Sequence, residues 1–264
     1  MIDFHNHILP NVDDGSTSLE MSITMLRNAA DQGITDVVNT VHFQHPKVLN
    51  KEISYQRIKK KINNLQIELL NSQIPITLHI GSEVFYYPNL VELRDEPLAT
   101  IGSGKYMLVE FHPNHIPTGH REILFNLKMS GVTPIIAHPE RYRGVHENID
   151  IVHKWIDTGC IIQVDAGSVL GLLGKKAKKT SELILKKELC QILGSDAHDD
   201  LNRNFVLYEA FLLAGSWIGK KANKLVYDNP RAVIDGQKIK VEFEEEYNKF
   251  RPNIWDRIIG KFEK

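Results

Sequence analysis

The sequence predicts an α/β fold, a distorted TIM-like barrel of seven βα units, on two observations. Segments with the apolar spacing of amphipathic helices alternate with short apolar runs, as expected for parallel strands that are buried on both faces. Three predicted helices also end in a glycine that a strand follows at once, at Gly33, Gly131 and Gly159. Because no Gly-x-Gly-x-x-Gly motif follows the first strand, a barrel is favoured over an open doubly wound sheet, which remains the alternative.

The predicted elements alternate along most of the chain. An apolar run around His5 and His7 is the first strand, and six more are expected at 34–42, 76–83, 106–112, 133–138, 160–165 and 189–198. Helices are expected at 18–32, 51–72, 120–130, 147–158, 177–187, 204–214 and 216–225. Ser18 has the side chain of an N-cap residue and predicts the start of the first helix.

The length of 264 residues is enough for one such domain, which we place at residues 1–236. Residues 237–264 are predicted to be a separate C-terminal tail. Its last part has Trp255, Ile258, Ile259 and Phe262 at helical spacing among charged residues. This pattern predicts an amphipathic helix that packs on the barrel or on another subunit, with weak contact to a membrane surface as the alternative.

Composition and charge exclude several classes of function. The formal net charge of −1 lacks the basic field of a nucleic-acid-binding protein. Neither a membrane span nor a secretory signal is recognisable, so we expect a cytoplasmic protein. Cys160 and Cys190 lie in apolar runs and are expected to be buried thiols. Neither cysteine is followed six residues later by arginine, which excludes the Cys-x5-Arg loop of thiol-based phosphatases.

Candidate metal ligands stand at the ends of six of the seven predicted strands. His5 and His7 alternate in extended backbone, so their imidazoles leave the same face, and Asp196 and His198 repeat this spacing. The full set is His5, His7, His42, Glu83, Glu110, His138, Asp196 and His198. Because the carboxyl ends of barrel strands converge on one face, this set predicts a site for more than one metal ion.

A single histidine at a strand end is more often a cap or a rim residue than a ligand. We therefore predict rim positions for the remaining histidines, which are His45, His79, His112, His115, His120, His146 and His153. The joint occurrence of ligands at six strand ends is what indicates a metal centre. Imidazole and carboxylate ligands without thiolates favour manganese, zinc or iron over magnesium or calcium.

Several motifs resemble those of the PHP (polymerase and histidinol phosphatase) superfamily of metal-dependent hydrolases. They are His5-x-His7, Thr40-x-His42, Gly81-x-Glu83, His138-Pro139 and Ser195-Asp196-x-His198. Longer segments are similar to one branch, the manganese-dependent tyrosine phosphatases of bacterial capsule and exopolysaccharide loci. These segments are Met1–Pro10, Val12–Gly15, Glu83–Tyr87, Val109–Phe111, Ile136–Tyr142 and Gly194–His198. The resemblance runs in order from Met1 to about Asp235 and implies the PHP fold.

The resemblance also implies three divalent metal ions, manganese first, with iron or zinc as alternatives. His5, His7, Glu83 and Asp196 match the ligands of the first ion, Glu83, Glu110 and His138 those of the second, and Asp14, His42 and His198 those of the third. Asp14 follows from the family pattern alone, because sequence chemistry does not separate it from Asp13. Arg141 and Arg203 match positions at which the family holds phosphate, a role that suits the guanidinium fork.

The activity so implied is metal-assisted hydrolysis of phosphotyrosine. The implied partner is the tyrosine-rich tail of a membrane-attached bacterial kinase that controls polysaccharide export, and the oligomeric state stays open, a homo-oligomer included. The main alternative is another phosphoesterase of the superfamily, such as a histidinol phosphatase. A polymerase-associated nuclease is disfavoured by the neutral charge. A catalytically inactive metal-binding scaffold is the alternative from another class, and His112 is our hypothesis for a general acid.

Overall fold

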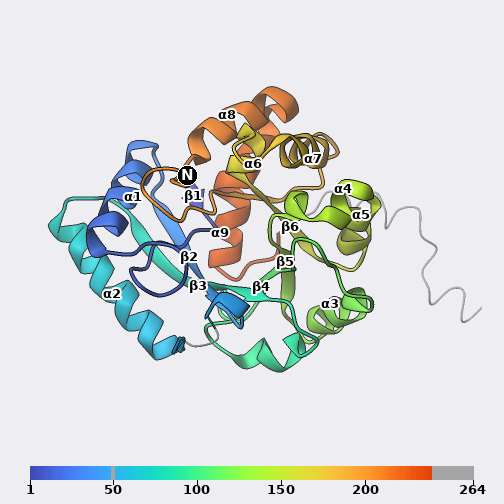
Figure 1. Ribbon diagram of the computed structural model, residues 1–264, viewed down its shortest axis with the longest axis horizontal. Helices are drawn as coiled ribbons and strands as arrows, with labels where there is room; N and C mark the ends of the chain where they lie inside the picture. Colours follow the sequence, from blue (N-terminus) through green and yellow to red (C-terminus); the bar gives the residue numbers. More distant parts are fainter. Residues whose placement is uncertain (49–50, 240–264) are drawn as a thin grey trace, which may run out of the picture.

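The computed structural model describes residues 1–48 and 51–239 and has the predicted barrel (Figure 1). Seven strands form one sheet in the order β1-β2-β3-β4-β5-β6-β7, and all neighbouring strands are parallel. They are β1 (Ile2–Asp3), β2 (Asp36–Phe43), β3 (Thr77–Phe85), β4 (Tyr106–Glu110), β5 (Thr133–Ile136), β6 (Ile161–Asp165) and β7 (Ile192–Gly194). The predicted amphipathic segment around Trp255 lies outside the described residues.

Most helices lie around the outside of the strands (Figure 1). They are α1 (Leu19–Asp31), α2 (Tyr55–Asn71), α3 (His120–Met129), α4 (Arg143–Glu147), α5 (Asp150–Asp157), α6 (Ala166–Leu170), α7 (Lys175–Lys186), α8 (Leu207–Ile218) and α9 (Asn229–Ile234). Shorter turns of 3-10 helix are η1 (Pro46–Val48), η2 (Leu90–Asp95), η3 (Pro139–Arg141) and η4 (Gly219–Lys221), and η5 (Lys224–Asp228) is π-helical. Helix α1 begins as predicted, since the Met21 N–H donates to Ser18 Oγ at 3.1 Å.

The prediction of two helices at 204–214 and 216–225 is wrong. One helix, α8, runs through Gly215, and the chain then continues as η4 and η5. A single interior glycine costs a helix only about 1 kcal/mol, which the packing of its flanking residues outweighs. The buried side chains of Leu207, Ala210 and Ala214 supply that packing on the N-terminal side of Gly215.

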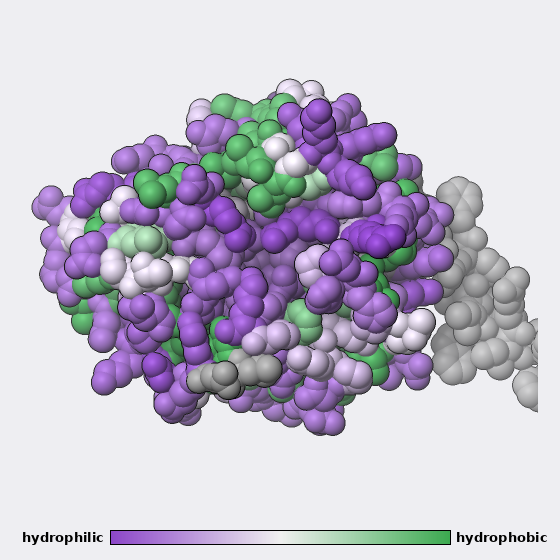
Figure 2. Space-filling view, in the orientation of Figure 1, coloured by the Kyte–Doolittle hydropathy of each residue, from purple (hydrophilic) through white to green (hydrophobic). Residues whose placement is uncertain are grey.

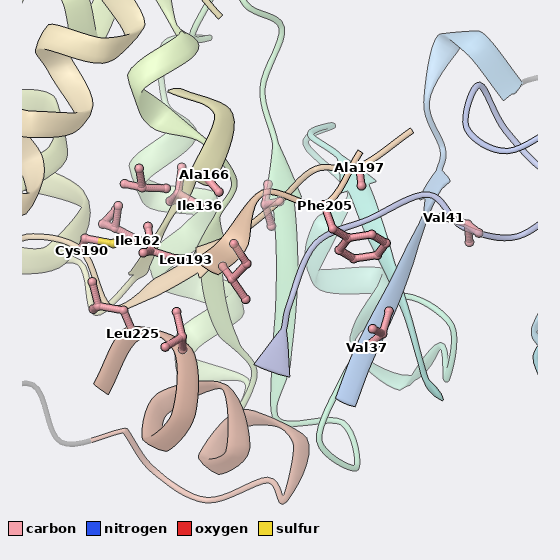
Figure 3. Close-up of a cluster of buried hydrophobic side chains, with 14 of the residues drawn as sticks. Val37, Val41, Ile136, Ile162, Ala166, Cys190, Leu193, Ala197, Phe205 and Leu225 are labelled. Atoms are coloured by element: carbon pink, nitrogen blue, oxygen red, sulfur yellow. The ribbon is translucent and has the colours of Figure 1, made fainter. Parts of the chain in front are cut away.

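Two layers of apolar side chains form the core. The outer layer lies between strands and helices, and Figure 3 shows part of it, with Val37 and Val41 of β2, Ile136 of β5, Ile162 of β6, Leu193 of β7, Phe205 and Leu225. The inner layer fills the barrel, where Val38 of β2, Leu108 of β4 and Ile192 of β7 meet Val233 of α9. Helix α9 lies near the centre of the ring of strands in Figure 1, and its Val233 packs against the inner layer, so the helix covers one end of the barrel. Cys160 and Cys190 are buried free thiols, as predicted.

The two-residue period of the strands divides polar from apolar positions inside the barrel. On β2, Val38 and His42 are four residues apart and face inward together, while Val37 and Val41 belong to the outer layer. Glu110 likewise follows the inward-facing Leu108 on β4. Strands β2 and β4 therefore each fill the middle of the barrel with an apolar side chain and present a polar one at the carboxyl end.

Backbone hydrogen bonds beyond the ends of β1 and β7 close the barrel. The Asp196 N–H donates to the His5 carbonyl at 2.7 Å, and the His7 N–H donates to the Ala197 carbonyl at 2.8 Å. Asn6 and Ala197 form the corresponding parallel bridge. Both predicted strands were longer than β1 and β7, because the chain leaves regular strand geometry where it approaches this closure.

The surface of the barrel is mostly hydrophilic in the view of Figure 2, with hydrophobic residues gathered at the top, over α8. Tyr208 and Leu212 are large residues of α8 with exposed side chains. Within the described part of the chain, no helix combines the length and the apolar character needed to cross a membrane.

Replacing Gly194 with alanine should destabilise the barrel at its closure. The added Cβ would lie 2.8 Å from the Cβ and 3.0 Å from the backbone nitrogen of His5. We expect the free energy of unfolding of the metal-free protein to fall by about 1–3 kcal/mol, as is typical of overpacking. Urea denaturation in the presence of a chelator measures it. The control Gly215→Ala, with open space around its Cβ, should be neutral or stabilising; equal stability of the two variants would contradict the prediction.

Candidate metal centre

The structure brings all nine predicted ligands into one cluster at the carboxyl ends of the strands. The side chains form four overlapping groups, and within each group the potential ligand atoms lie within 4.8 Å of one another. One group is His7, Asp14, His42 and His198, and a second is His5, His7 and Asp196. The third is His5, Glu83 and His138, and the fourth is His42, His45 and Glu110. Eight of the nine residues are buried, and Asp14 is the exposed member. Side chains more than 190 positions apart in the sequence therefore share one site.

Glu83 lies at the centre of the cluster. Its Oε2 faces Nε2 of His5 at 3.3 Å, Nε2 of His7 at 3.5 Å and Nδ1 of His42 at 3.1 Å. Its Oε1 is 2.9 Å from Nε2 of His138. A fully buried carboxylate with four imidazoles around it can serve two ions at once, one through each oxygen.

The geometry separates Asp13 from Asp14, which sequence chemistry left open. Asp14 Oδ1 faces Nε2 of His42 at 3.2 Å and Nε2 of His198 at 3.5 Å, inside the cluster. Asp13 points away from these atoms: its Oδ2 pairs with Nδ1 of His7 at 2.7 Å and accepts the His42 backbone N–H at 3.0 Å. Asp13 is thus an orienting partner of the histidines, and Asp14 is the member of the candidate ligand set.

Hydrogen bonds on the far side of three imidazoles decide which nitrogen faces the cluster. Nδ1 of His5 is 3.0 Å from Gln163 Oε1, Nδ1 of His7 is paired with Asp13, and Nδ1 of His198 is 2.9 Å from the Asp196 carbonyl. These acceptors place the proton on Nδ1 and leave the Nε2 lone pair pointing inward. Such an outer partner is the usual companion of a metal-binding histidine.

The inward-facing atoms fit divalent cations. Nε2 of His5 and Nε2 of His7 have no hydrogen-bond partner in the described part of the chain, although they lie 3.3–3.5 Å from carboxylate oxygens. Burial lowers the pKa of the His5 imidazole, but the charges of Glu83 and then Asp196 outweigh it and raise the pKa to about 9, so the ring of the metal-free protein holds a second proton. A cation would take the place of that proton and satisfy the buried polar atoms, so the donor set fits the metals predicted from sequence.

The pKa of the Glu110 carboxyl also reflects burial and the neighbouring charges. Burial, and next the negative charge of Glu83, raise the pKa of the Glu110 carboxyl to about 8. Its Oε1 faces Nε2 of His138 at 3.7 Å, and its Oε2 faces Nδ1 of His42 at 3.9 Å. In the metal-free protein near neutral pH, the carboxyl therefore holds a proton that a bound cation would displace.

Two candidate ligands have backbone conformations that are rare for residues with a side chain. His138 has φ of 31° and Asp196 has φ of 47°, both in the left-handed region. The turn at these positions interrupts the alternation of β5 and β7 at the strand ends. Strain of this kind costs about 1–3 kcal/mol per residue and is concentrated at functional sites.

The two predicted phosphate-binding arginines converge on one oxygen atom. Nη1 of Arg141 and Nη2 of Arg203 both pair with Oδ2 of Asp196, the latter at 2.7 Å. The other oxygen, Oδ1, faces Nε2 of His5 at 3.4 Å and Nε2 of His7 at 3.3 Å. Asp196 thus links the arginines to the cluster, and the partly exposed side chains of Arg141 and Arg203 stand at its edge.

Sequence reasoning missed several residues that support the cluster. Strand β6 was predicted to end without a ligand, yet Gln163 orients His5, and Asp165 caps α6 and faces Arg141 at 3.5 Å. The prediction that His45 is a rim residue is wrong, since it is buried beside His42. Gln163 and Asp165 are two residues apart on β6, so both side chains leave the inner face of the strand. This spacing is a signal from which both residues could have been identified in the sequence.

The general-acid hypothesis for His112 finds no support in the geometry. Strand β4 ends at Glu110, so the shared parity of the two side chains does not extend to His112. His112 is exposed, and its Nδ1 accepts the Asn114 backbone N–H at 3.2 Å.

Comparisons with known proteins agree with this geometry. The family described as capsular polysaccharide synthesis, CpsB/CapC, matches residues 1–235. The tyrosine-protein phosphatase CpsB of Streptococcus pneumoniae is 32% identical over 253 residues, covering 90% of this chain and 100% of that protein. The tyrosine-protein phosphatase YwqE of Bacillus subtilis is 30% identical over 240 residues, covering 90% and 93%.

Solved structures share the fold of this chain. One from the work on YwqE and CpsB, described as unique metal-dependent tyrosine phosphatases, has a TM-score of 0.85 at 29% identity, covering 91% of this chain and 96% of that chain. A histidinol phosphate phosphatase from Lactococcus lactis has a TM-score of 0.54 at 13% identity, covering 83% and 93%, which is a likeness of fold alone.

Manganese binding to the metal-free protein should release protons, and the release should be smaller at pH 9 than at pH 7. The pKa of Glu110 is raised to about 8, so its carboxyl is mostly protonated at pH 7 and mostly ionised at pH 9. Binding requires the ionised form, and Glu110 should contribute about one proton at the lower pH. Titration calorimetry in buffers of different ionisation enthalpy counts the protons. Equal release at both pH values would contradict this view of Glu110.

Proposed function

Because the chain belongs to the CpsB/CapC family of capsular polysaccharide synthesis proteins, we propose that it is a metal-dependent protein-tyrosine phosphatase of the PHP superfamily. The observation that carries the proposal is the cluster of five imidazoles and four carboxylates at the mouth of the barrel. Relatives named tyrosine-protein phosphatases align with nearly the whole chain, which supports the reaction class. The catalytic domain is residues 1–236, and the reaction takes place in the cytoplasm.

The proposal assigns three divalent metal ions, manganese first, to the nine side chains. His5, His7, Glu83 and Asp196 hold one ion, Glu83, Glu110 and His138 hold a second, and Asp14, His42 and His198 hold the third. The distances from Glu83 to His5 and His138 and from Asp14 to His42 and His198 support this division. Bound metal would supply Lewis-acid chemistry, polarising phosphoryl oxygens and making a water molecule more acidic.

Arg141 and Arg203 bind the phosphoryl group in this proposal. Their guanidinium groups already stand together at the Asp196 carboxylate, at the edge of the cluster, so they can donate to two phosphoryl oxygens. Their positive charge offsets the charge on these oxygens as phosphorus is attacked. Asp196 keeps both arginines oriented before substrate binds.

The leaving group lowers the demand for a general acid. Tyrosine has a pKa of about 10, well below that of serine, so its phenolate needs less help to depart than a serine alkoxide does. The exposed position of His112 is consistent with this view. A preference for phosphotyrosine over phosphoserine therefore follows from chemistry as well as from shape.

The substrate we propose is the phosphotyrosine tail of a membrane-attached bacterial tyrosine kinase that regulates capsule or exopolysaccharide synthesis. The family description supports a role in capsular polysaccharide synthesis. A flexible tail can reach a site at the end of a barrel, where Arg203 is about one-third exposed at the rim (34%).

The metal-reconstituted protein should hydrolyse a phosphotyrosine peptide, and histidinol phosphate should be a much poorer substrate. His138→Ala should lower kcat/KM by about 100-fold or more, since loss of a ligand exceeds the 10- to 100-fold effect of an outer partner. Phosphate release is measured with manganese added after chelation. Faster turnover of histidinol phosphate would favour the rival phosphoesterase, and metal binding without either activity would favour the scaffold.

Arg141→Ala should lower kcat/KM for the same peptide by about 100- to 1000-fold, as for the loss of one donor to a transition-state oxyanion. Arg141→Lys should retain a kcat/KM between those of Arg141→Ala and the wild type, because an ammonium group cannot make the forked contact. The matched control is Arg143→Ala, two residues along the chain, whose side chain is 70% exposed and pairs with Glu147. An unchanged kcat/KM for Arg141→Ala would remove this arginine from the phosphate site.

A further inference from the structure

His45 lies in the segment after β2 and is packed tightly against the cluster. Its ring stacks on that of His42, with centroids 4.2 Å apart and planes at 21°. Phe85 packs edge-on against its other side at 4.8 Å. Only 7% of the residue is exposed. Gln44, the residue just before His45, has φ of 56°, so a left-handed turn directs His45 back over His42.

One backbone hydrogen bond decides the tautomer of His45. The Lys47 N–H donates to Nδ1 of His45 at 3.0 Å. Nδ1 must therefore offer its lone pair, and the proton of the neutral ring resides on Nε2. His45 is in this respect the reverse of His5, His7 and His198, whose Nδ1 atoms face acceptors.

The Nε2–H group of His45 faces one oxygen of Glu110. Nε2 lies 3.3 Å from Oε2, a separation that a small rotation of either side chain would turn into a hydrogen bond. In the described part of the chain, Oε2 is buried and makes no hydrogen bond, so it is an unsatisfied acceptor beside this N–H. The other oxygen, Oε1, faces His138 at 3.7 Å. Oε2 is thus closer to His45 than to His42, which is 3.9 Å away, and Oε1 faces the candidate ligand His138.

The same tautomer argues against His45 as a metal ligand, although its atoms lie within 4.8 Å of those of His42 and Glu110. A metal on Nε2 would have to displace its proton while Nδ1 still accepts from Lys47. That requires the imidazolate anion, which forms only far above neutral pH. A neutral N–H donor is the form that the surroundings of His45 stabilise.

We propose that His45 is a positioning residue for the metal centre: its Nε2–H binds Oε2 of Glu110 and thereby turns Oε1 towards the metal shared with His138 and Glu83. The inference rests on the proposed function only in that Glu110 binds a metal ion. His45 would orient Glu110 in the way that Asp13 orients His7 and Gln163 orients His5.

Two variants separate donation from packing. His45→Gln keeps an N–H donor and loses the stacked ring, whereas His45→Phe keeps a ring and loses the donor. In the full-length protein, stripped of metal and titrated with manganese by calorimetry, His45→Phe should weaken one manganese site by about 10- to 100-fold. His45→Gln should stay close to wild type. A control is His153→Phe, on α5, which should leave manganese binding unchanged.

Each other result would overturn the proposal. Wild-type affinity in His45→Phe would show that the donor is dispensable, and weak binding in His45→Gln with normal binding in His45→Phe would assign His45 to packing. Loss of a whole manganese equivalent in both variants would make His45 a ligand. If His45→Phe lowers the unfolding free energy of the metal-free protein, His45→Met serves as the second donor-free variant.

The readout keeps this test separate from that of the proposed function. Wild-type protein that binds manganese but leaves a phosphotyrosine peptide intact would refute the phosphatase and leave the comparison of variants valid. Wild-type protein that hydrolyses the peptide while all variants bind manganese equally would refute the role of His45 alone.

Discussion

Two backbone hydrogen bonds, from Asp196 to His5 and from His7 to Ala197, hold together both the barrel and the candidate metal centre. The residues that close the ring of strands are also those whose side chains enter the cluster. Because Gly194 lies against His5 at this point, the strands approach too closely for any larger side chain. The spacing between the first and last strands therefore decides the spacing of His5, His7 and Asp196.

Burying so many charged and polar groups together costs free energy, and this cost requires compensating partners around the cluster. Four candidate-ligand carboxylates lie in or beside a barrel whose middle is filled by apolar side chains. Buried carboxylates are tolerated only where cations or donors face them. Arg141 and Arg203 supply this on one side of Asp196, and His45 offers an N–H on one side of Glu110. In Asp196 one oxygen accepts from both arginines, and the other faces His5 and His7.

Left-handed backbone at His138, Asp196 and Gln44 follows from the same demands. A regular strand would send alternate side chains in and out and would bring fewer of them to one point. The turns at these residues add side chains to the inner face just beyond the strands. The apolar interior, with α9 across the far end of the barrel, provides the stability that permits such local strain.

The sequence by itself predicted the barrel, its order of strands and eight of the nine candidate ligands, since these depend on local periodicity and on which residues end each strand. It did not determine which of Asp13 and Asp14 enters the cluster, because adjacent residues differ only in direction. Nor did it reveal Gln163 or His45. The hydrogen bond of Gln163 spans 158 positions to His5, and His45 depends on a turn at Gln44. Partners of this kind arise only when distant strand ends meet, so the tertiary structure alone decided them.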